Sequence, residues 1–243
     1  MTGEELPTRV LERFGLQGPV RSLGTAGGFS GARFWQIQQA QGDWGIRRWP
    51  REHPPVSRLK WIHSVLSHSL GQGFPLLPPM RITPAGESFV RESGFLWECS
   101  RWMPGIPALK QDPDSIRIAN ALEALARFHR SVEEFLPRQG RSPAPAIENR
   151  LVFYQSLVGG GLVAIQERLG ESDWADLNQR AGKIVDRFQG LRGQLQSRLA
   201  SAPRCRVRLL PCIRDIRPAH VLFVENDVST FIDFGAMRID SAA

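Results

Sequence analysis

The strongest constraint on the fold comes from residues 213–237, IRDIRPAHVLFVENDVSTFIDFGAM. Two short apolar runs, residues 221–224 and 228–232, flank the turn-forming tripeptide END, and this pattern predicts a β-hairpin. Asp215 lies before the first run and Asp233 directly follows the second. Because antiparallel pairing brings the outer ends of two strands together, we expect both carboxylates at one end of this hairpin.

A pair of carboxylates at one place says more about chemistry than either carboxylate alone. A single aspartate beside a strand is more often a loop cap than a functional group. Two of them at one end of a hairpin can divide the work of phosphoryl transfer, with one acting as a base and the other binding magnesium. The tripeptide DFG at residues 233–235 makes a purely structural explanation of this pair harder.

A glycine-rich segment, SLGTAGGFSGARFWQI, lies between two strand-like stretches near the N-terminus. Glycines allow backbone N–H groups to approach phosphate oxygens closely. The next strand, WGIRRWP, carries a cation at Arg47 or Arg48 that could neutralise phosphate charge. A flexible hairpin loop explains the glycines equally well. The segment is neither a P-loop nor a dinucleotide fingerprint, because it joins strand to strand and has no GK[ST] ending.

The character of the 243-residue chain changes near residue 100. The first hundred residues read mostly as strands, with a short amphipathic helix at 6–14 and a longer one at 56–70, and the next hundred read as helices. A strongly amphipathic helix is predicted at 114–136, and two more at 151–169 and 174–199. The apolar stripe predicted for the first of these consists of Ile116, Ala119, Leu122, Ala126, His129 and Val132. This order predicts an α+β fold of two lobes with a boundary near residues 101–105.

Composition excludes several other classes of protein. The net charge is +7, but the chain lacks the aromatic–basic interleaving and the recognition-helix pattern of a nucleic-acid-binding protein. No apolar run approaches the roughly 18 residues that a membrane span requires, and the polar N-terminus does not read as a signal peptide. Three scattered cysteines suit a reducing compartment. We therefore expect a cytoplasmic protein without a membrane or a specific nucleic-acid partner.

Taken in order, the motifs resemble those of the aminoglycoside phosphotransferase-type members of the protein-kinase-like fold. The matching segments are GTAGGFSG, WGIRRWP, FLWECSRWMPG, ALEALARFHRS, IRDIRPAHVLF and IDFGAM. The resemblance covers nearly the whole chain, and the last two segments are its specific ones. It implies a two-lobed fold, with residues 1–100 forming a β-rich nucleotide-binding lobe and residues 101–243 a helical lobe.

The resemblance also implies a role for each matching residue. Asp215 would be the catalytic base, Asp233 the principal magnesium ligand and His220 the metal ligand of the catalytic loop. Arg47 occupies the place of a phosphate-binding lysine. The nucleotide would contact the glycine loop and the backbone of the linker strand, at Gly27, Gly28, Phe29, Ser30, Ser100, Arg101 and Trp102.

The sequence departs from the family pattern at several of these places. Arg47 replaces lysine, which keeps the charge but changes its shape and reach. The helix at 56–70 contains no glutamate to pair with that cation, and Glu52 lies before it. His220 replaces asparagine, and an imidazole is a softer ligand than the oxygens that magnesium prefers, so manganese is an alternative. Ile213 replaces a mainly structural histidine.

The resulting hypothesis is a phosphotransferase that uses ATP and Mg²⁺, with Mn²⁺ as an alternative ion, and acts on a hydroxyl of a small molecule. The acceptor class spans aminoglycosides, choline and sugars. The alternative is a pseudokinase-type module that binds nucleotide or a partner with little catalysis. The sequence stops eight residues after Gly235, so we expect a helical lobe incomplete at its C-terminus. An apolar surface left uncovered there would favour self-association.

Overall fold

The computed structural model describes residues 6–25, 31–136, 141–169, 171, 173–201 and 205–242. The chain divides into two compact units. The first comprises residues 1–136 and 213–238, and the second comprises residues 137–212 and 239–243. The lobe boundary predicted near residues 101–105 lies inside the first unit and stays a prediction. No helix of the described residues is both long and apolar enough to span a bilayer.

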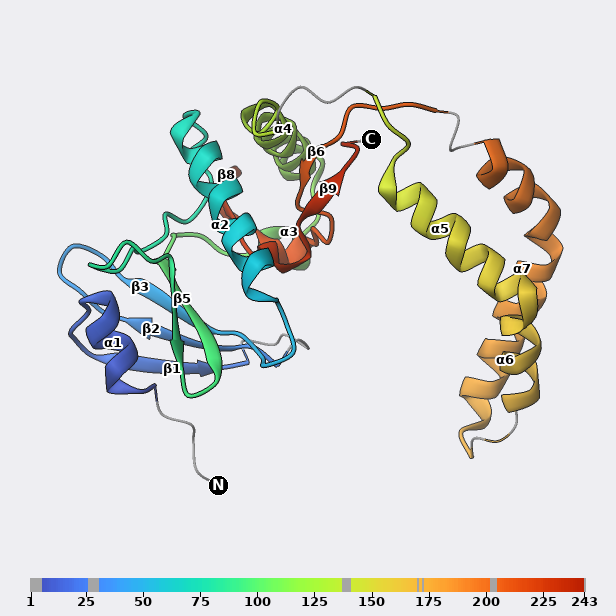
Figure 1. The fold of residues 1–243 in the computed structure, drawn as a ribbon, viewed down its shortest axis with the longest axis horizontal. Helices are drawn as coiled ribbons and strands as arrows, with labels where there is room; N and C mark the ends of the chain where they lie inside the picture. The colour runs from blue at the N-terminus through green and yellow to red at the C-terminus, as the bar shows by residue number, and fades with distance from the viewer. Residues whose placement is uncertain are drawn as a thin grey trace. The chain divides into compact units, whose positions relative to one another are not determined.

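A five-stranded antiparallel sheet forms the N-terminal part of the first unit (Figure 1). Its strands are β1 (Val20–Gly24), β2 (Arg33–Ile37), β3 (Trp44–Arg48), β4 (Phe89–Glu92) and β5 (Phe95–Arg101), in the spatial order β1-β2-β3-β5-β4. The predicted hairpin with the glycine-rich bend is confirmed, since β1 pairs with β2, and the predicted strand that follows, β3, pairs with β2 on its other side. This order places β3 and β5 side by side at the centre of the sheet.

The two faces of the sheet have different partners. Helix α1 (Thr8–Phe14) packs on one face, where Trp35, Ile46 and Trp97 are almost completely buried. Helix α2 (Val56–Gly71) packs on the other face through Leu59. Because side chains alternate along a strand, consecutive residues of β3 and β5 project towards different helices.

The rest of the first unit contains α3 (Ala108–Gln111), α4 (Ser115–Ser131) and the hairpin of β7 (Val221–Val224) and β8 (Asp227–Phe231). Asp114 caps the N-terminus of α4, because its carboxylate accepts a hydrogen bond from the backbone N–H of Arg117 at 2.9 Å. The apolar stripe predicted for this helix is only partly right. Ile116 and Leu122 are exposed, whereas the buried residues of α4 are Ala124 and Phe128. Contact between Phe128 and the ring of Phe74, 5.8 Å apart, explains which face is buried.

The second unit consists mainly of α5 (Pro145–Ser156), α6 (Leu162–Arg168) and α7 (Ala175–Ser201), with α5 and α6 lying along α7 (Figure 1). The single helix predicted at 151–169 is wrong, because a wide turn at Leu157–Gly161 separates α5 from α6. Within it Gly160 has φ +133°, a conformation that ordinary residues rarely adopt. Two short strands, β6 (Leu210–Cys212) and β9 (Arg238–Asp240), form a separate pair.

Candidate active site

The open end of the β7–β8 hairpin brings the predicted carboxylates towards one histidine. Val221 pairs with Phe231, and the next residue outward, Ile232, donates its N–H to the carbonyl of His220 at 2.9 Å. This pairing places Asp233 beside His220. The hairpin predicted from the sequence is confirmed, and its turn brings together residues that are 13 positions apart in the chain.

Asp233 is the meeting point of the charged groups in this cluster. Its Oδ1 accepts a hydrogen bond from Nη2 of Arg47 at 3.1 Å, and its Oδ2 lies 3.7 Å from Nε2 of His220. Its backbone is left-handed, with φ +63°, and its side chain is 43% exposed. The left-handed conformation is uncommon for residues other than glycine, so the chain accepts local strain where this carboxylate is presented to solvent.

A hydrogen bond of the His220 ring shows which of its two nitrogens carries the proton and which carries the lone pair. Its Nδ1 lies 2.9 Å from the backbone carbonyl oxygen of Asp215. A carbonyl oxygen can only accept, so Nδ1 carries the proton and the neutral ring has its lone pair on Nε2. That lone pair lies near a carboxylate oxygen of Asp233. An imidazole nitrogen and a carboxylate held by other hydrogen bonds are a suitable donor pair for a divalent cation.

Asp215 is exposed and paired with its neighbour in the loop. Arg217 donates two hydrogen bonds to it, from Nη2 to Oδ2 at 2.8 Å and from Nε to Oδ1 at 3.3 Å. The hydrogen bonds and charge of Arg217 hold the pKa of Asp215 below its ordinary value. A carboxylate has about four acceptor positions, so Asp215 can still accept a hydrogen bond from a hydroxyl group.

Arg47, and not Arg48, faces this cluster. Its guanidinium carbon lies 3.5 Å from the ring centroid of Trp49 and 5.3 Å from that of Phe34. The side chain is only 11% exposed. Arg48 projects from the other face of the sheet and stacks 4.2 Å from the ring of Phe95. Strand alternation therefore decides between the two cations that the sequence left open.

A carboxylate that the sequence analysis missed lies opposite Arg47. Glu98 of β5 is its cross-strand partner, with Oε1 4.0 Å from Nη1 of Arg47. The other oxygen of Glu98 lies 2.9 Å from Nε2 of His63, whose Nδ1 lies 2.8 Å from Oγ of Ser88. Burial alone would raise the pKa of Glu98, but His63 and Arg47 together outweigh it and lower this pKa. The cation therefore has a second anionic partner, although α2 contributes no glutamate.

One feature of the sequence could have pointed to Glu98, and another to His63. Glu98 is the single acidic residue of FLWECSR, a strand otherwise typical of the interior, and an unpaired carboxylate is costly there. His63 follows Ile62 on the buried side of α2 and is itself buried. Arg217 was missed because its interest depends on the side-chain contact with Asp215.

In the linker strand, where a nucleotide contact is predicted, two backbone N–H groups donate within the protein. The N–H of Arg101 donates to the carbonyl of Pro79 at 2.8 Å, and that of Trp102 donates to the carbonyl of Asp43 at 2.9 Å. Ser100 lies in the β3–β5 pairing. These two N–H groups are already used by the fold. The amide of Met103 has no such partner among the described residues. The predicted loop contacts, Gly27, Gly28, Phe29 and Ser30, lie outside the described residues.

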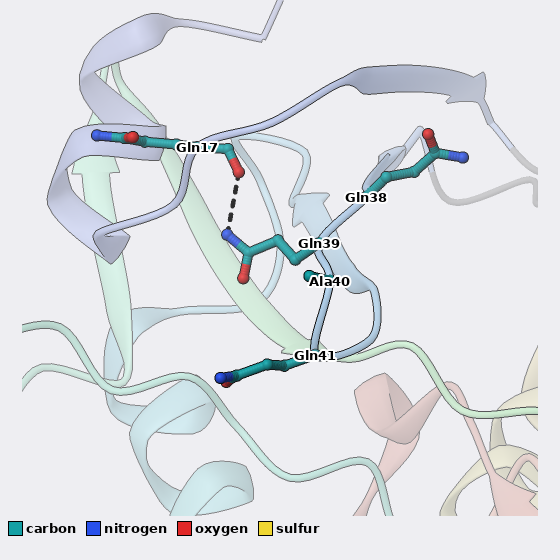
Figure 2. Close-up of a pocket in the computed structure, with 5 residues that line it drawn as sticks. All are labelled: Gln17, Gln38, Gln39, Ala40 and Gln41. Carbon is teal, nitrogen blue, oxygen red and sulfur yellow. Dashed lines mark hydrogen bonds between the residues drawn. The ribbon is translucent and has the colours of Figure 1, made fainter.

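A shallow hollow elsewhere on the sheet does not share this chemistry. It has a volume of about 400 Å³ and is lined by Gln17, Gln38, Gln39, Ala40 and Gln41 (Figure 2). Gln39 donates from Nε2 to the carbonyl of Gln17 at 3.0 Å across it. None of the five lining residues is ionisable, so their side chains offer neither a base nor a charged metal ligand.

Arg47 projects from a central strand of the sheet, and Asp215 and Asp233 lie at the open end of the β7–β8 hairpin. This arrangement is typical of the protein-kinase-like class of folds. Within that class, the chain belongs to the phosphotransferase enzyme family, whose sequence profile matches residues 24–243. Members of this family are kinases of small molecules that transfer phosphate to hydroxyl groups. No curated protein matches the sequence significantly.

Solved structures of low identity share the fold. An aminoglycoside phosphotransferase from Alicyclobacillus acidocaldarius has 14% identity and a TM-score of 0.60, and the match covers 99% of this chain and 69% of that one. Spectinomycin phosphotransferase, solved with ADP and spectinomycin, has 11% identity and a TM-score of 0.59, covering 96% and 69%. A macrolide 2'-phosphotransferase from Brachybacterium faecium has 15% identity and a TM-score of 0.56, covering 97% and 74%. The α+β, kinase-like fold predicted from the sequence is confirmed.

Proposed function

We propose that this protein transfers a phosphoryl group from ATP to a hydroxyl of a small molecule, with a divalent cation as cofactor. The observation that supports this most is the cluster of Asp233, Arg47 and His220, beside a loop that presents Asp215. A cluster with these charges suits positioning and charge neutralisation, which dominate catalysis of phosphoryl transfer. Spectinomycin phosphotransferase, a structural relative, has been solved with ADP.

Asp233 and His220 would bind the metal ion. The carboxylate is exposed and the lone pair on Nε2 of His220 lies on its side of the ring. Magnesium bound to phosphates neutralises charge that develops during transfer. Since imidazole is softer than an oxygen ligand, manganese suits this pair at least as well as magnesium.

Arg47 would pair with phosphate oxygens, together with backbone N–H groups of Gly27, Gly28, Phe29 and Ser30. For the adenine ring, the amide of Met103 is the better donor, since the N–H groups of Arg101 and Trp102 are bonded within the protein. We keep the division into two lobes as part of the proposal. The nucleotide would bind mainly to residues 1–100, and the acceptor mainly to residues 101–243.

Asp215 would accept the proton of the acceptor hydroxyl, or orient that hydroxyl. An aspartate with an ordinary pKa is already ionised at neutral pH, and the lowered pKa of Asp215 extends this state further into acid. A proton acceptor requires the ionised form. The relatives include proteins solved with spectinomycin and hygromycin B. We propose an acceptor with several hydroxyl groups from the same broad class, in a cytoplasmic protein that needs neither a membrane nor a nucleic acid.

Calorimetry of ATP binding in the presence of Mg²⁺ or Mn²⁺ tests the proposal. Wild type should bind with metal-dependent affinity, and Asp233→Ala should reduce that affinity at least about tenfold, because it removes the charged ligand. Asp227→Ala, at the turn end of the same β8 strand, is the matched control and should bind normally. Absence of binding by wild type would reject the proposal. Binding without turnover of any hydroxyl acceptor would favour the pseudokinase alternative.

A further inference from the structure

The position of Arg47 depends on more than the carboxylate it contacts most closely. The hydrogen bond to Asp233 is 3.1 Å long, but Asp233 is also the proposed metal ligand. A carboxylate that binds a divalent cation gives up much of its attraction for a neighbouring guanidinium. Something other than Asp233 must then hold Arg47 in place when metal and nucleotide are bound.

Glu98 is placed to do so. It lies directly across from Arg47 in the β3–β5 pairing and projects from the same face of the sheet. Its side chain is 16% exposed, compared with 43% for Asp233. A carboxylate in such a setting has few competing water molecules, so its attraction for a cation about 4 Å away is weakly screened. Stacking on Trp49 restricts the guanidinium further.

Glu98 is in turn fixed by helix α2. Nε2 of His63 must donate to the carboxylate, because the carboxylate can only accept. The hydroxyl of Ser88 can donate to Nδ1 and thereby leave the proton on Nε2. His63 is buried, so these bonds form away from solvent. The chain Ser88–His63–Glu98–Arg47 connects the helix to the cation.

We infer that Glu98 and His63 are positioning residues that fix the guanidinium of Arg47 for phosphate binding, in place of a glutamate on the helix. This rests on the proposed function of Arg47. It also explains how the site retains a fixed cation although α2 contains no acidic residue. In this proposal both act through Arg47 and not on the acceptor or the reacting atoms.

The first test does not need nucleotide. NMR of the arginine side chains, with Arg47 assigned through Arg47→Lys, reports how freely its guanidinium rotates. Wild type should show restricted rotation, and Glu98→Gln, which keeps the shape but removes the charge, should release it. Glu92→Gln on the neighbouring strand is the matched control and should change nothing. An unchanged Arg47 signal in Glu98→Gln would overturn the inference.

The second test is a double-mutant cycle on the affinity for ADP with Mg²⁺ or Mn²⁺. Glu98→Gln should lower affinity about tenfold when Arg47 is present and less than about twofold in an Arg47→Met background. His63→Gln should lower it about threefold, while His68→Gln on the same helix should not. An equal loss in both backgrounds would show that Glu98 acts only through the fold, and would also overturn the inference.

The two arms separate the two hypotheses. If wild type binds no ADP, the proposed function fails, but the NMR comparison still decides whether Glu98 fixes Arg47. If Glu98→Gln does not fold, His63→Gln enters both arms in its place, because it leaves the charge of Glu98 and removes only its anchor. Unchanged rotation of Arg47 in that variant would count against the inference.

Discussion

Asp215 presents a carboxylate to solvent while Arg217 occupies two of its acceptor positions. Asp215→Asn keeps the size of the side chain but removes its ability to take a proton. We expect phosphoryl transfer to fall by about 10²-fold or more and nucleotide affinity to stay within a few-fold of wild type. Turnover of ATP with a panel of hydroxyl acceptors measures the first, and calorimetry the second. Equal turnover by the variant would remove Asp215 from the mechanism.

Arg217 determines how far into acid Asp215 stays ionised. The pKa of Asp215 is lowered, mainly by the hydrogen bonds from Arg217, so Arg217→Gln should raise it. The base works only when ionised, so activity is lost as pH falls through this pKa. The acid limb of kcat/KM should therefore lie at higher pH in Arg217→Gln than in wild type. Arg217→Lys, which keeps the charge, should shift the limb less. Coincident acid limbs in all three proteins would contradict this role.

His220 should give the metal site a distinctive preference. Imidazole binds manganese more readily than magnesium, so His220→Asn should shift the preference towards magnesium. Titrations of both proteins with Mg²⁺ and with Mn²⁺ provide the measurement. An identical metal preference would show that His220 only closes the loop through its bond to the Asp215 carbonyl.

At the scale of residues, the sequence predicted the part of the site that is local in the chain. Asp215, His220 and Asp233 lie on one hairpin, so turn chemistry and alternation suffice to bring them together. Glu98 and His63 reach Arg47 from another strand and from a helix. Their contact depends on the β3–β5 register and on the rotation of α2, which a single sequence does not specify.

At the scale of elements, the linker after β5 packs tightly on the β7–β8 hairpin. Ile106 and Phe223 exchange backbone hydrogen bonds of 3.0 and 2.9 Å. Gly105, directly before Ile106, has φ +118°, and a Cβ there would lie 2.5 Å from Oγ of Ser229 and 2.9 Å from the carbonyl oxygen of Phe223. The contact therefore requires glycine at this position.

Gly105→Ala should consequently destabilise the protein by about 2–3 kcal/mol, from overpacking together with an unfavourable φ. Gly73→Ala is the matched control. Gly73 also has a positive φ, +80°, but nothing lies within 4 Å of the Cβ position, so its loss should be about 1–2 kcal/mol. Urea unfolding monitored by circular dichroism compares the two. Equal losses would mean that backbone strain alone, and not the contact with the hairpin, requires Gly105.

Element types were predicted well where periodicity was strong, and the errors have physical causes. The helix predicted at 151–169 contains the run Gly159–Gly161, and glycine weakens helix continuity. The stripe on α4 was misassigned because apolar residues occur on more than one side of that helix. Its buried side depends on Phe74, which lies more than 50 positions earlier in the chain.

At the scale of the whole molecule, the second unit carries many exposed apolar side chains. They include Val152, Phe153, Val163, Trp174 and Ile184, each more than half exposed. Exposed apolar surface in excess tends to find a partner. We expect the 243-residue chain to self-associate in a concentration-dependent way. The double variant Phe153→Ser and Ile184→Ser should be more nearly monomeric in light scattering, and a wild type monomeric at every concentration would contradict the expectation.

The stacked guanidinium of Arg47 also limits the routes by which this sequence can change. A lysine at position 47 would lose the planar surface that lies on Trp49 and the fork that reaches Glu98 and Asp233 at once. A change at Trp49 or Glu98 alone would leave the arginine partly unsupported. Substitutions at the three positions are therefore epistatic, since the effect of each depends on the other two. In this chain, a lysine at position 47 would have to be accompanied by changes in the residues around it.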